Sequence, residues 1–454
     1  MALDKPSPAA LVHLSGGYCD DIGQIIRMPG FRSADPVAKA RRVVHIAWRS
    51  LDEYVSVLDD GGVYRYVSSN GREFSDVAPS QGFVTSAVFD QILYFARPGQ
   101  PMLTFDGAQF RESGTTLTGA AYVTVVQNRL IVADYESQLV NLSWADRPEV
   151  FYRDQPASEE SVLRAGFLAI DRILPEAEAI KGLSSFEQNI LLVFTQARTY
   201  AFVIDPDINQ IRQEVRLNIN VGALHHNAIV RARNDVLFAS RNDVHSMRRA
   251  LTSGVSLIES GVADRIQYDY REQPKLNPSM HYDEDNNLVW LATKDRTYLA
   301  HLGADPGDVR WASVDAPGFD CVSGMEGRTV VGRSGSILEM NSFFSPEEQH
   351  PLTFRTPVFW FDNPVLQKRL HSISLIFDGD ADFVLEVFDH AGQALQSRRG
   401  RLSSEYLGID RPDSMQHGHA ELPLRVRSRG FYFVFSCTGK GFFRFYAIRL
   451  LIES

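Results

Sequence analysis

Short apolar runs separated by tight polar turns recur through the first three quarters of the chain. The clearest copy, residues 88–105, reads as strand, polar turn, apolar strand, second turn and strand. Its turns contain Asp, Gly and Pro, which are favoured in turns for their backbone geometry. Related copies lie at residues 47–67, 125–141, 185–204, 230–247, 281–301 and 324–340. The pattern predicts a chain built from repeated small antiparallel sheets.

The spacing of these copies indicates the architecture. Their second strands begin at Tyr54, Leu93, Leu130, Leu191, Val236, Leu288 and Thr329. Most of the steps between these starts are close to one another in length, and the step from Leu130 to Leu191 is the longest. A period of roughly 40 residues with three or four strands per unit is typical of a β-propeller blade. We therefore expect an all-β protein with a β-propeller over residues 41–341, and both six and seven blades fit the spacing.

Residues 1–40 are irregular and rich in Gly, Pro and Asp, and we interpret them as an N-terminal arm and ring-closing segment. The last unit, residues 318–341, is short and is predicted to take its missing strand from the N-terminus. Residues 24–28 are the strand candidate there. Closing the ring in this way would remove exposed sheet edges.

Two of the longer steps predict inserts near residues 146–180 and 258–275. The first is charged and contains three prolines. In the second, Val262, Ile266 and Tyr270 have helical spacing, which predicts one short helix. Inserts in propellers project from a rim and often contact partners.

The pattern changes after a polar linker at residues 342–351. Residues 354–361, 373–377, 383–388, 420–426, 431–436 and 442–451 read as strands, many with alternating apolar and polar positions. We expect residues 352–454 to form a separate antiparallel β-sandwich, jelly-roll-like in type.

Composition and charge narrow the function classes. The 454 residues contain no apolar run long enough for a membrane helix, and the N-terminus lacks a signal pattern. Cys19, Cys321 and Cys437 are far apart and odd in number, which favours reduced, buried thiols and assembly in a cytoplasm-like compartment. The net charge of −10 argues against ordinary nucleic-acid binding. The acidity lies in residues 1–350, with 33 Lys and Arg against 45 Asp and Glu.

Candidate metal sites are weak. Residues 283–287, Asp-Glu-Asp-Asn-Asn, resemble the start of a calcium loop, but Leu288 and Lys294 occupy the positions that require Gly and Glu. A solvated hairpin turn explains them better. His225 with His226, and His417 with His419, are the only close histidine pairs, and no further ligands lie near them. We expect no metal and no cofactor.

Candidate catalytic and binding clusters are equally weak. The residues around Ser334 lack the spacing and the strand-to-helix context of a nucleophile elbow. Acidic neighbours such as Asp59 with Asp60 and Glu159 with Glu160 would point to opposite faces of a strand. Residues 398–401, Arg-Arg-Gly-Arg, read as a basic loop that is either solvated or in contact with an acidic partner or phosphate. We predict that the protein is not an enzyme and has no catalytic residues.

One family resemblance adds to this interpretation. Residues 354–361, Phe-Arg-Thr-Pro-Val-Phe-Trp-Phe, are followed by Asn363-Pro364 and by residues 368–371, Lys-Arg-Leu-His, and the turn at residues 378–380 is Asp-Gly-Asp. These phrases resemble the opening of the C-terminal domain in nozzle proteins of short-tailed bacteriophages, also called tail tubular or stabilisation proteins. Residues 26–30, Ile-Arg-Met-Pro-Gly, are similar to the segment before that family's first blade, with Met28 as an addition.

The resemblance implies a structural role. Such proteins form a sixfold ring below the adaptor and portal, extend and gate the DNA channel, and carry fibres, spikes or a needle. The implied partners are copies of the same chain in a hexamer, the adaptor or head-tail connector protein, tail fibre, spike or needle proteins, and genomic DNA that passes without sequence-specific binding. The implied location is the virion tail, with assembly in the host cytoplasm. An acidic lumen would let DNA slide.

Two other functions stay open at this point. A propeller glycosidase or carbohydrate-binding protein would need inward carboxylates and aromatic platforms at one end of the axis. A cytoplasmic scaffold of the WD-repeat type ranks last, because the Gly-His and Trp-Asp signatures are missing from the repeats.

Overall fold

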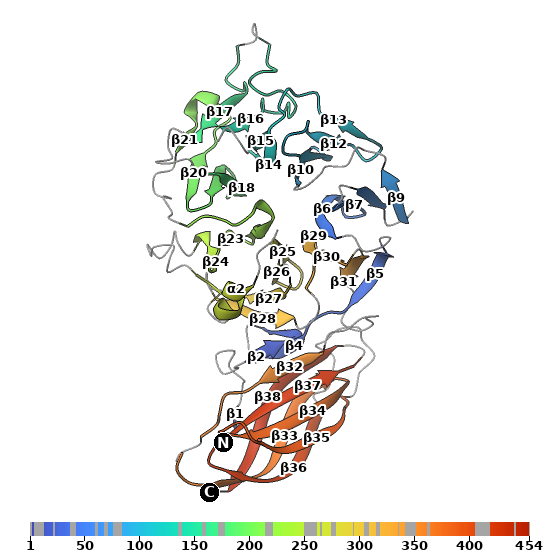
Figure 1. The fold of residues 1–454 in the computed structure, drawn as a ribbon, viewed down its shortest axis with the longest axis vertical. Helices are drawn as coiled ribbons and strands as arrows, with labels where there is room; N and C mark the ends of the chain where they lie inside the picture. Colours follow the sequence, from blue (N-terminus) through green and yellow to red (C-terminus); the bar gives the residue numbers. More distant parts are fainter. Residues whose placement is uncertain are drawn as a thin grey trace. The chain divides into compact units, whose positions relative to one another are not determined.

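A computed structural model gives the fold (Figure 1). It describes residues 2–3, 13–20, 23–36, 42–59, 62–67, 71–75, 84–134, 139–156, 160–170, 178–213, 221–248, 261–263, 266–273, 278–293, 295–303, 308–314, 318–334, 336–340, 351–360, 364–404, 418–439 and 442–453.

Internal contacts divide the chain into two compact units. The larger unit comprises residues 33–295 and 318–338, and the smaller unit comprises residues 1–32, 296–317 and 339–454. The predicted linker at residues 342–351 lies outside the described residues apart from residue 351.

The larger unit is built from small antiparallel sheets that follow one another along the chain (Figure 1). The first four groups are β6 (Val43–Ser50) to β9 (Gly71–Ser75), β10 (Thr85–Phe89) to β13 (Phe110–Glu112), β14 (Ala120–Val126) to β17 (Gly166–Ala169), and β18 (Ile180–Phe186) to β21 (Arg212–Gln213). The intervening strands are β7 (Glu53–Leu58), β8 (Val63–Val67), β11 (Ile92–Ala96), β12 (Leu103–Phe105), β15 (Arg129–Asp134), β16 (Leu139–Leu142), β19 (Ile190–Thr195) and β20 (Thr199–Val203).

Three further groups complete the series. The fifth is β22 (Ile229–Ala232), β23 (Asp235–Ala239) and β24 (Val244–Ser246). The sixth begins with β25 (Ser279–Asp283) and β26 (Leu288–Ala292). The next strands along the chain, β27 (Thr297–Leu302) and β28 (Val309–Val314), belong to the smaller unit. The seventh is β29 (Cys321–Met325), β30 (Arg328–Arg333) and β31 (Ser336–Met340).

The first strands of these groups close a ring. Among the described residues, β6, β10, β14, β18, β22, β25 and β29 each contact the next, and β29 contacts β6. Seven first strands therefore surround one axis. The predicted all-β propeller is confirmed, and of the two blade numbers that fitted the sequence the structure has seven.

Burial of both sheet faces explains why the middle strands are continuously apolar. Leu191 and Val193 of β19 pack with the third blade, in a cluster that includes Ile131. The alternate residues Leu192 and Phe194 pack with Phe238 of the fifth blade. Successive side chains of a strand point to opposite faces, so a sheet between two neighbours needs apolar residues at every position.

Tight turns set the hairpin register within a blade. Asp90 and Gln91 have φ values of 50° and 61°, and Gln127 and Asn128 have values of 49° and 54°. Two consecutive residues with positive φ give the two-residue turn whose twist matches a β-hairpin. The polar turns recognised in the sequence at residues 88–105 and 125–141 are therefore the hairpin turns of the second and third blades.

An N-terminal strand completes the seventh blade, as expected, but it is not the strand we predicted. Residues 31–36 form β5 (Phe31–Pro36), which pairs with β31. The candidate at residues 24–28 instead forms β4 (Ile25–Arg27), which pairs with β3 (Gly17–Cys19) and with β38 of the smaller unit. Ile25, Ile26 and Arg27 are all buried, which suits an internal strand.

The segment at residues 146–180 is only partly an insert. Residues 166–169 form β17, the outer strand of the third blade, which pairs with β16. Arg129 is fully buried and donates hydrogen bonds to the carbonyls of Ser143, Arg164 and Pro206 at 2.6, 3.0 and 2.7 Å. This one guanidinium ties the segment to the third and fourth blades.

The segment at residues 258–275 contains the predicted short helix, α2 (Gln267–Glu272). Val262, Ile266 and Tyr270 are buried, but the helix begins at Gln267, so of the three only Tyr270 is helical. The Tyr270 hydroxyl donates to the Ser240 carbonyl at 2.6 Å. The helix therefore packs on the fifth blade, which has three described strands.

The smaller unit contains the predicted antiparallel sandwich. One sheet has the order β4–β38–β33–β36, and the other contains β32–β37–β34–β35. Their strands are β32 (Leu352–Arg355), β33 (Lys368–Gly379), β34 (Ala381–Asp389), β35 (Ala394–Leu402), β36 (Gly418–Ser428), β37 (Phe431–Thr438) and β38 (Phe443–Glu453). The core between the sheets is rich in Phe, including Phe354, Phe383, Phe435 and Phe445.

The second sheet of the sandwich extends beyond the predicted domain boundary. β2 (His13–Ser15) pairs on one side with β32 and on the other with β28, and β28 pairs with β27. The strands β2, β27 and β28 therefore share a continuous sheet with β32, β37, β34 and β35. For this reason the boundaries of the two compact units differ from the predicted domain boundaries at residues 41, 341 and 352.

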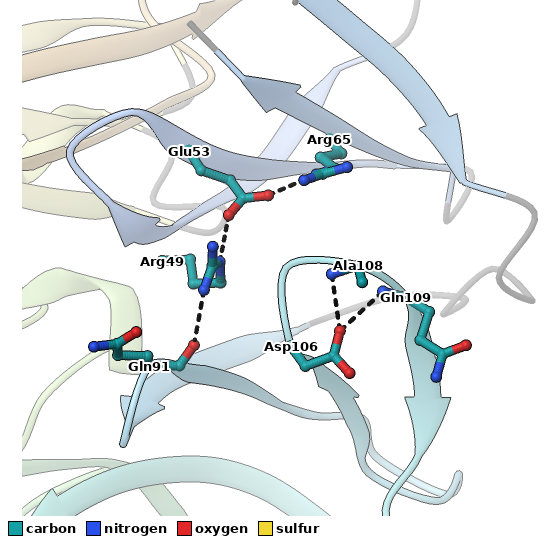
Figure 2. Close-up of polar contacts among 7 residues, drawn as sticks. All are labelled: Arg49, Glu53, Arg65, Gln91, Asp106, Ala108 and Gln109. Carbon is teal, nitrogen blue, oxygen red and sulfur yellow. Dashed lines mark hydrogen bonds and ion pairs between the residues drawn. The ribbon is translucent and has the colours of Figure 1, made fainter. Parts of the chain in front are cut away.

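An ion-pair cluster joins the first two blades (Figure 2). Glu53 is 3% exposed and accepts a hydrogen bond from Arg65 Nε at 2.6 Å while its other oxygen pairs with Arg49. Arg49 Nη1 also donates to the carbonyl of Gln91, in the β10–β11 turn, at 3.3 Å. A buried carboxylate between two guanidinium groups fixes the β6–β7 turn against the next blade. Nearby, Asp106 caps the β12–β13 turn by accepting from the amides of Ala108 and Gln109.

We expect Glu53→Gln to destabilise the larger unit by about 1.5–3 kcal/mol, because a buried charged hydrogen-bond acceptor is lost while its shape is kept. Urea unfolding followed by tryptophan fluorescence measures this, since Trp48 packs against Tyr54 beside the cluster. Glu187→Gln, at an exposed turn, serves as the control and should change stability little. Equal losses of unfolding free energy in Glu53→Gln and Glu187→Gln would contradict a stabilising role for the Glu53 ion-pair cluster.

Candidate functional site

A polar cavity lies among the first strands of the propeller. It has a volume of about 160 Å³ and is lined by residues of β6, β22, β25 and β29 and of the 3₁₀ turn η5 (His226–Ala228). Its polar lining side chains are His45, His226, Asn227, Ser279 and Ser323. We call this the axial cavity.

His45 connects three blades at the cavity. Its Nε2 lies 2.7 Å from the Ser86 hydroxyl on β10, and its Nδ1 lies 3.5 Å from the Asn227 side-chain nitrogen. An amide nitrogen can only donate, so Nδ1 is the acceptor and the ring proton sits on Nε2. His45 is thus held as the neutral Nε2–H tautomer.

His226 is also held neutral. Its Nδ1 accepts the backbone N–H of Leu183 at 3.1 Å, and its ring stacks on Tyr122 with 5.8 Å between centroids. Because Nδ1 is an acceptor, the ring carries its proton on Nε2. The preceding His225 repeats this geometry, with Nδ1 accepting the Asn227 N–H at 3.2 Å.

Enclosure by protein keeps these imidazoles uncharged. Burial lowers the pKa of His45 to about 4 and the pKa of His281 on β25 to about 3. Burial, and then the neighbouring histidines, lower the pKa of His226 to about 3. For His225 the causes of a pKa of about 3 are burial, His45 and Lys181. The loss of water around a cation disfavours protonation in each case.

The structure gives the other sequence candidates structural roles. Asp283 is fully buried and accepts from the backbone N–H and side-chain nitrogen of Asn286, which makes the expected hairpin turn. Burial raises the pKa of Asp283. His419 is exposed on β36, and His417, Asp60 and Glu159 lie outside the described residues. Gly332 lies close to Val43 and Cys321, so the segment before Ser334 packs between blades.

The basic residues 398–401 form part of a strand, not the loop we predicted. They lie in β35, an edge strand paired with β34, and Arg398 donates to the Pro423 carbonyl of β36 at 2.8 Å. Arg399 and Arg401 are exposed. Charged edge strands are common because they discourage pairing with other chains.

Cys19, Cys321 and Cys437 are free and buried, as predicted. Nowhere in the described part of the chain do three or more His, Cys, Asp or Glu side chains lie in a group that could hold a metal ion. The described helices include none with the length and apolar character needed to span a bilayer.

Exposed apolar side chains concentrate in two places. Tyr152, Val162, Leu163 and Phe167 lie in the segment at residues 146–180, with Val162 52% exposed and Phe167 47% exposed. We call these four residues the segment patch. Trp360, Val365 and Leu366 lie in the loop before β33 of the smaller unit, and we call them the loop patch. Together they supply seven of the ten large exposed hydrophobic side chains among the described residues.

Known structures resemble the chain in fold. The WD40 β-propeller domain of Doa1 is 13% identical over 69% of this chain and 96% of its own, with a TM-score of 0.44. YCF48 from Cyanidioschyzon merolae is 12% identical over 69% and 98%, with a TM-score of 0.43. Streptogramin B lyase is 10% identical over 69% and 98%, with a TM-score of 0.46. Likeness at this level carries no inference about function, and the strand pairing above defines the propeller.

The sequence has no significant match to a protein-family model or to a curated protein.

We expect stability of the larger unit to fall as pH decreases from about 6.5 towards 4. The unfolded chain protonates its histidines near pH 6.5, whereas the folded histidines have lowered pKa values, so the unfolded state binds more protons below pH 6.5. Thermal unfolding between pH 7.5 and 4.5 measures this. His281→Gln should flatten the fall, and His419→Gln in the smaller unit should leave it unchanged. If stability falls equally with pH in the wild type and in His281→Gln, the buried His281 is not a cause of the fall.

Proposed function

We propose that the protein is a structural component of a short-tailed phage virion. In this proposal six copies form a nozzle or hub ring below the adaptor and portal, extend and gate the DNA channel, and anchor fibres, spikes or a needle. The protein performs no chemical reaction. The proposal begins from the family resemblance, and the observations below support it.

The resembling phrases occupy defined positions. Lys368, which opens β33, is buried and donates from Nζ to the carbonyls of Trp360 and Leu366 at 3.0 and 3.5 Å. This contact holds the preceding loop in place. Gly379 ends β33 with a φ of 94°, which suits the Asp-Gly-Asp turn. Lys368 therefore fixes the loop before β33, which presents the loop patch, and Gly379 forms the turn at the other end of the same strand.

The two separate apolar patches are the observation that carries the proposal. A chain that works alone gains nothing from exposing Phe167 and Val365 to water. Two different patches on one subunit favour a head-to-tail contact, in which the segment patch of one copy meets the loop patch of the next. Contacts of this type close into rings when the rotation between copies allows it.

The glycosidase alternative has less support. It requires carboxylates that converge on the propeller axis. The side chains that line the axial cavity are His, Asn, Ser, Cys and apolar residues, and no Asp or Glu is among those described there. A carboxylate pair for acid-base chemistry is therefore missing from the described lining of the place where that function needs it.

Electron microscopy and mass photometry of the purified chain test the ring. We expect six-subunit rings with a central hole at micromolar concentration. Val162→Asp combined with Phe167→Asp should leave circular dichroism unchanged and reduce ring formation at least tenfold, because each charge opposes burial of the segment patch. Leu51→Asp, at an exposed hydrophobic residue outside both patches, is the matched control and should still form rings.

A single-subunit wild type over this concentration range would contradict the proposal. If the double variant forms rings as readily as the wild type, the segment patch does not take part in the contact between subunits. In that case Val365→Asp with Leu366→Asp tests the loop patch separately.

A further inference from the structure

The axial cavity presents hydrogen-bond donors. The Nε2–H of His226 is not used by the Leu183 contact, which occupies Nδ1. The Ser279 hydroxyl accepts the Val322 N–H at 3.0 Å, so its own proton is available to donate. The Asn227 amide has a second hydrogen beyond the one directed at His45. Three side chains from two elements thus offer protons at one cavity.

The described side chains that line the cavity include no carboxylate. The titratable groups on the elements that surround it are His45 and Arg49 on β6, His225 and His226 before β22 and Arg231 on it, Lys181 on β18, His281, Tyr282 and Asp283 on β25, and Cys321 on β29. Asp283 of β25 accepts hydrogen bonds from the backbone N–H and the side chain of Asn286. Asp320, which precedes β29, accepts a hydrogen bond from Arg42 Nε at 3.0 Å. A negative ligand would meet donors and, among the described residues, no opposing free carboxylate.

From this geometry we propose that the axial cavity binds one small oxyanion of the carboxylate or phosphate type. His226, Asn227 and Ser279 would donate to its oxygens, and His45 would hold Asn227 in position from the opposite side. The inference goes beyond the proposed function and does not depend on it, because a propeller with any role would contain the same cavity.

Cavity size limits the ligand. A volume of about 160 Å³ corresponds to roughly five water molecules at about 30 Å³ each. Drug-sized ligands occupy pockets of about 300–1,000 Å³. Acetate or inorganic phosphate therefore fits, whereas a nucleotide or an oligosaccharide does not.

Binding should strengthen as pH falls. A bound anion favours the protonated form of a nearby imidazole, which raises the pKa of that imidazole. Proton uptake on binding increases affinity by up to about tenfold per pH unit while the free site is neutral. His226 is the lining group in position to take up the proton, since His45 has both ring nitrogens occupied.

Isothermal titration calorimetry of the full chain with inorganic phosphate and with acetate tests the proposal, with ionic strength held constant by sodium chloride. We expect one saturable site per chain and an affinity that rises at least threefold between pH 7.5 and 6.0. Asn227→Asp introduces a negative charge at nearly constant volume and should weaken binding more than tenfold. His226→Gln, whose amide oxygen can still accept from Leu183, should weaken binding without loss of the fold.

Asn242→Asp is the matched control, because it adds the same charge at an exposed residue of the fifth blade. It should retain the wild-type affinity. Absence of a saturable site in wild type, or equal loss of affinity in Asn242→Asp and Asn227→Asp, overturns the proposal. Equally tight binding of an uncharged polyol such as glycerol also overturns the proposal, since that outcome shows that the cavity binds neutral ligands.

Discussion

Each blade of the propeller has two apolar faces, and both must be covered. This constraint governs the larger unit. Leu191 and Leu192 are adjacent in one strand but belong to different cores, one shared with the third blade and one with the fifth. Such a strand is stable only between two neighbours, so the series of blades has no natural end until it closes on itself. Val43 and Tyr54 of the first blade accordingly pack with Val330 and Ile337 of the seventh.

The repeat could be predicted because this constraint leaves a local signature. Continuous apolar middle strands and polar two-residue turns recur at a roughly constant spacing, and each can be recognised without its neighbours. Other strands have no such signature. β17 begins at Gly166, far along the chain from the end of β16 at Leu142, and its residues form a strand because the outer edge of β16 needs a partner. β35 is rich in arginine because it lies at an edge, so its sequence reads as a loop. Both depend on pairing that a linear pattern does not encode.

The axial cavity could not be predicted for a related reason. His45 and Ser86 are 41 residues apart, and His45 and Asn227 are 182 apart. Nothing in either neighbourhood distinguishes these residues from ordinary polar positions in a strand. A weak signal does exist, since Ser86, Ser279, His281 and Ser323 each place a polar side chain within a first strand. Its meaning depends on knowing that first strands face the axis, and this becomes clear only once the ring is closed.

The N-terminal residues connect these constraints to the order in which the chain can fold. β5 pairs with β31, β4 pairs with β38, and β2 lies between β28 and β32. Every one of these partners lies in the last third of the chain. The seventh blade therefore stays incomplete until β31 is available, and the first sheet of the sandwich stays incomplete until the last strand, which ends at Glu453, is available. Contacts of such long sequence separation form late, because the entropy of closing the loop is lost before the contact is gained.

Until these contacts form, the partly folded chain exposes unpaired strand edges, which pair readily with other chains. The described strands that expose most charge, β35 and β36, lie at sheet edges that stay open in the finished unit. Permanent edges are thus protected by arginine, whereas temporary edges are apolar and depend on the N-terminal strands to cover them.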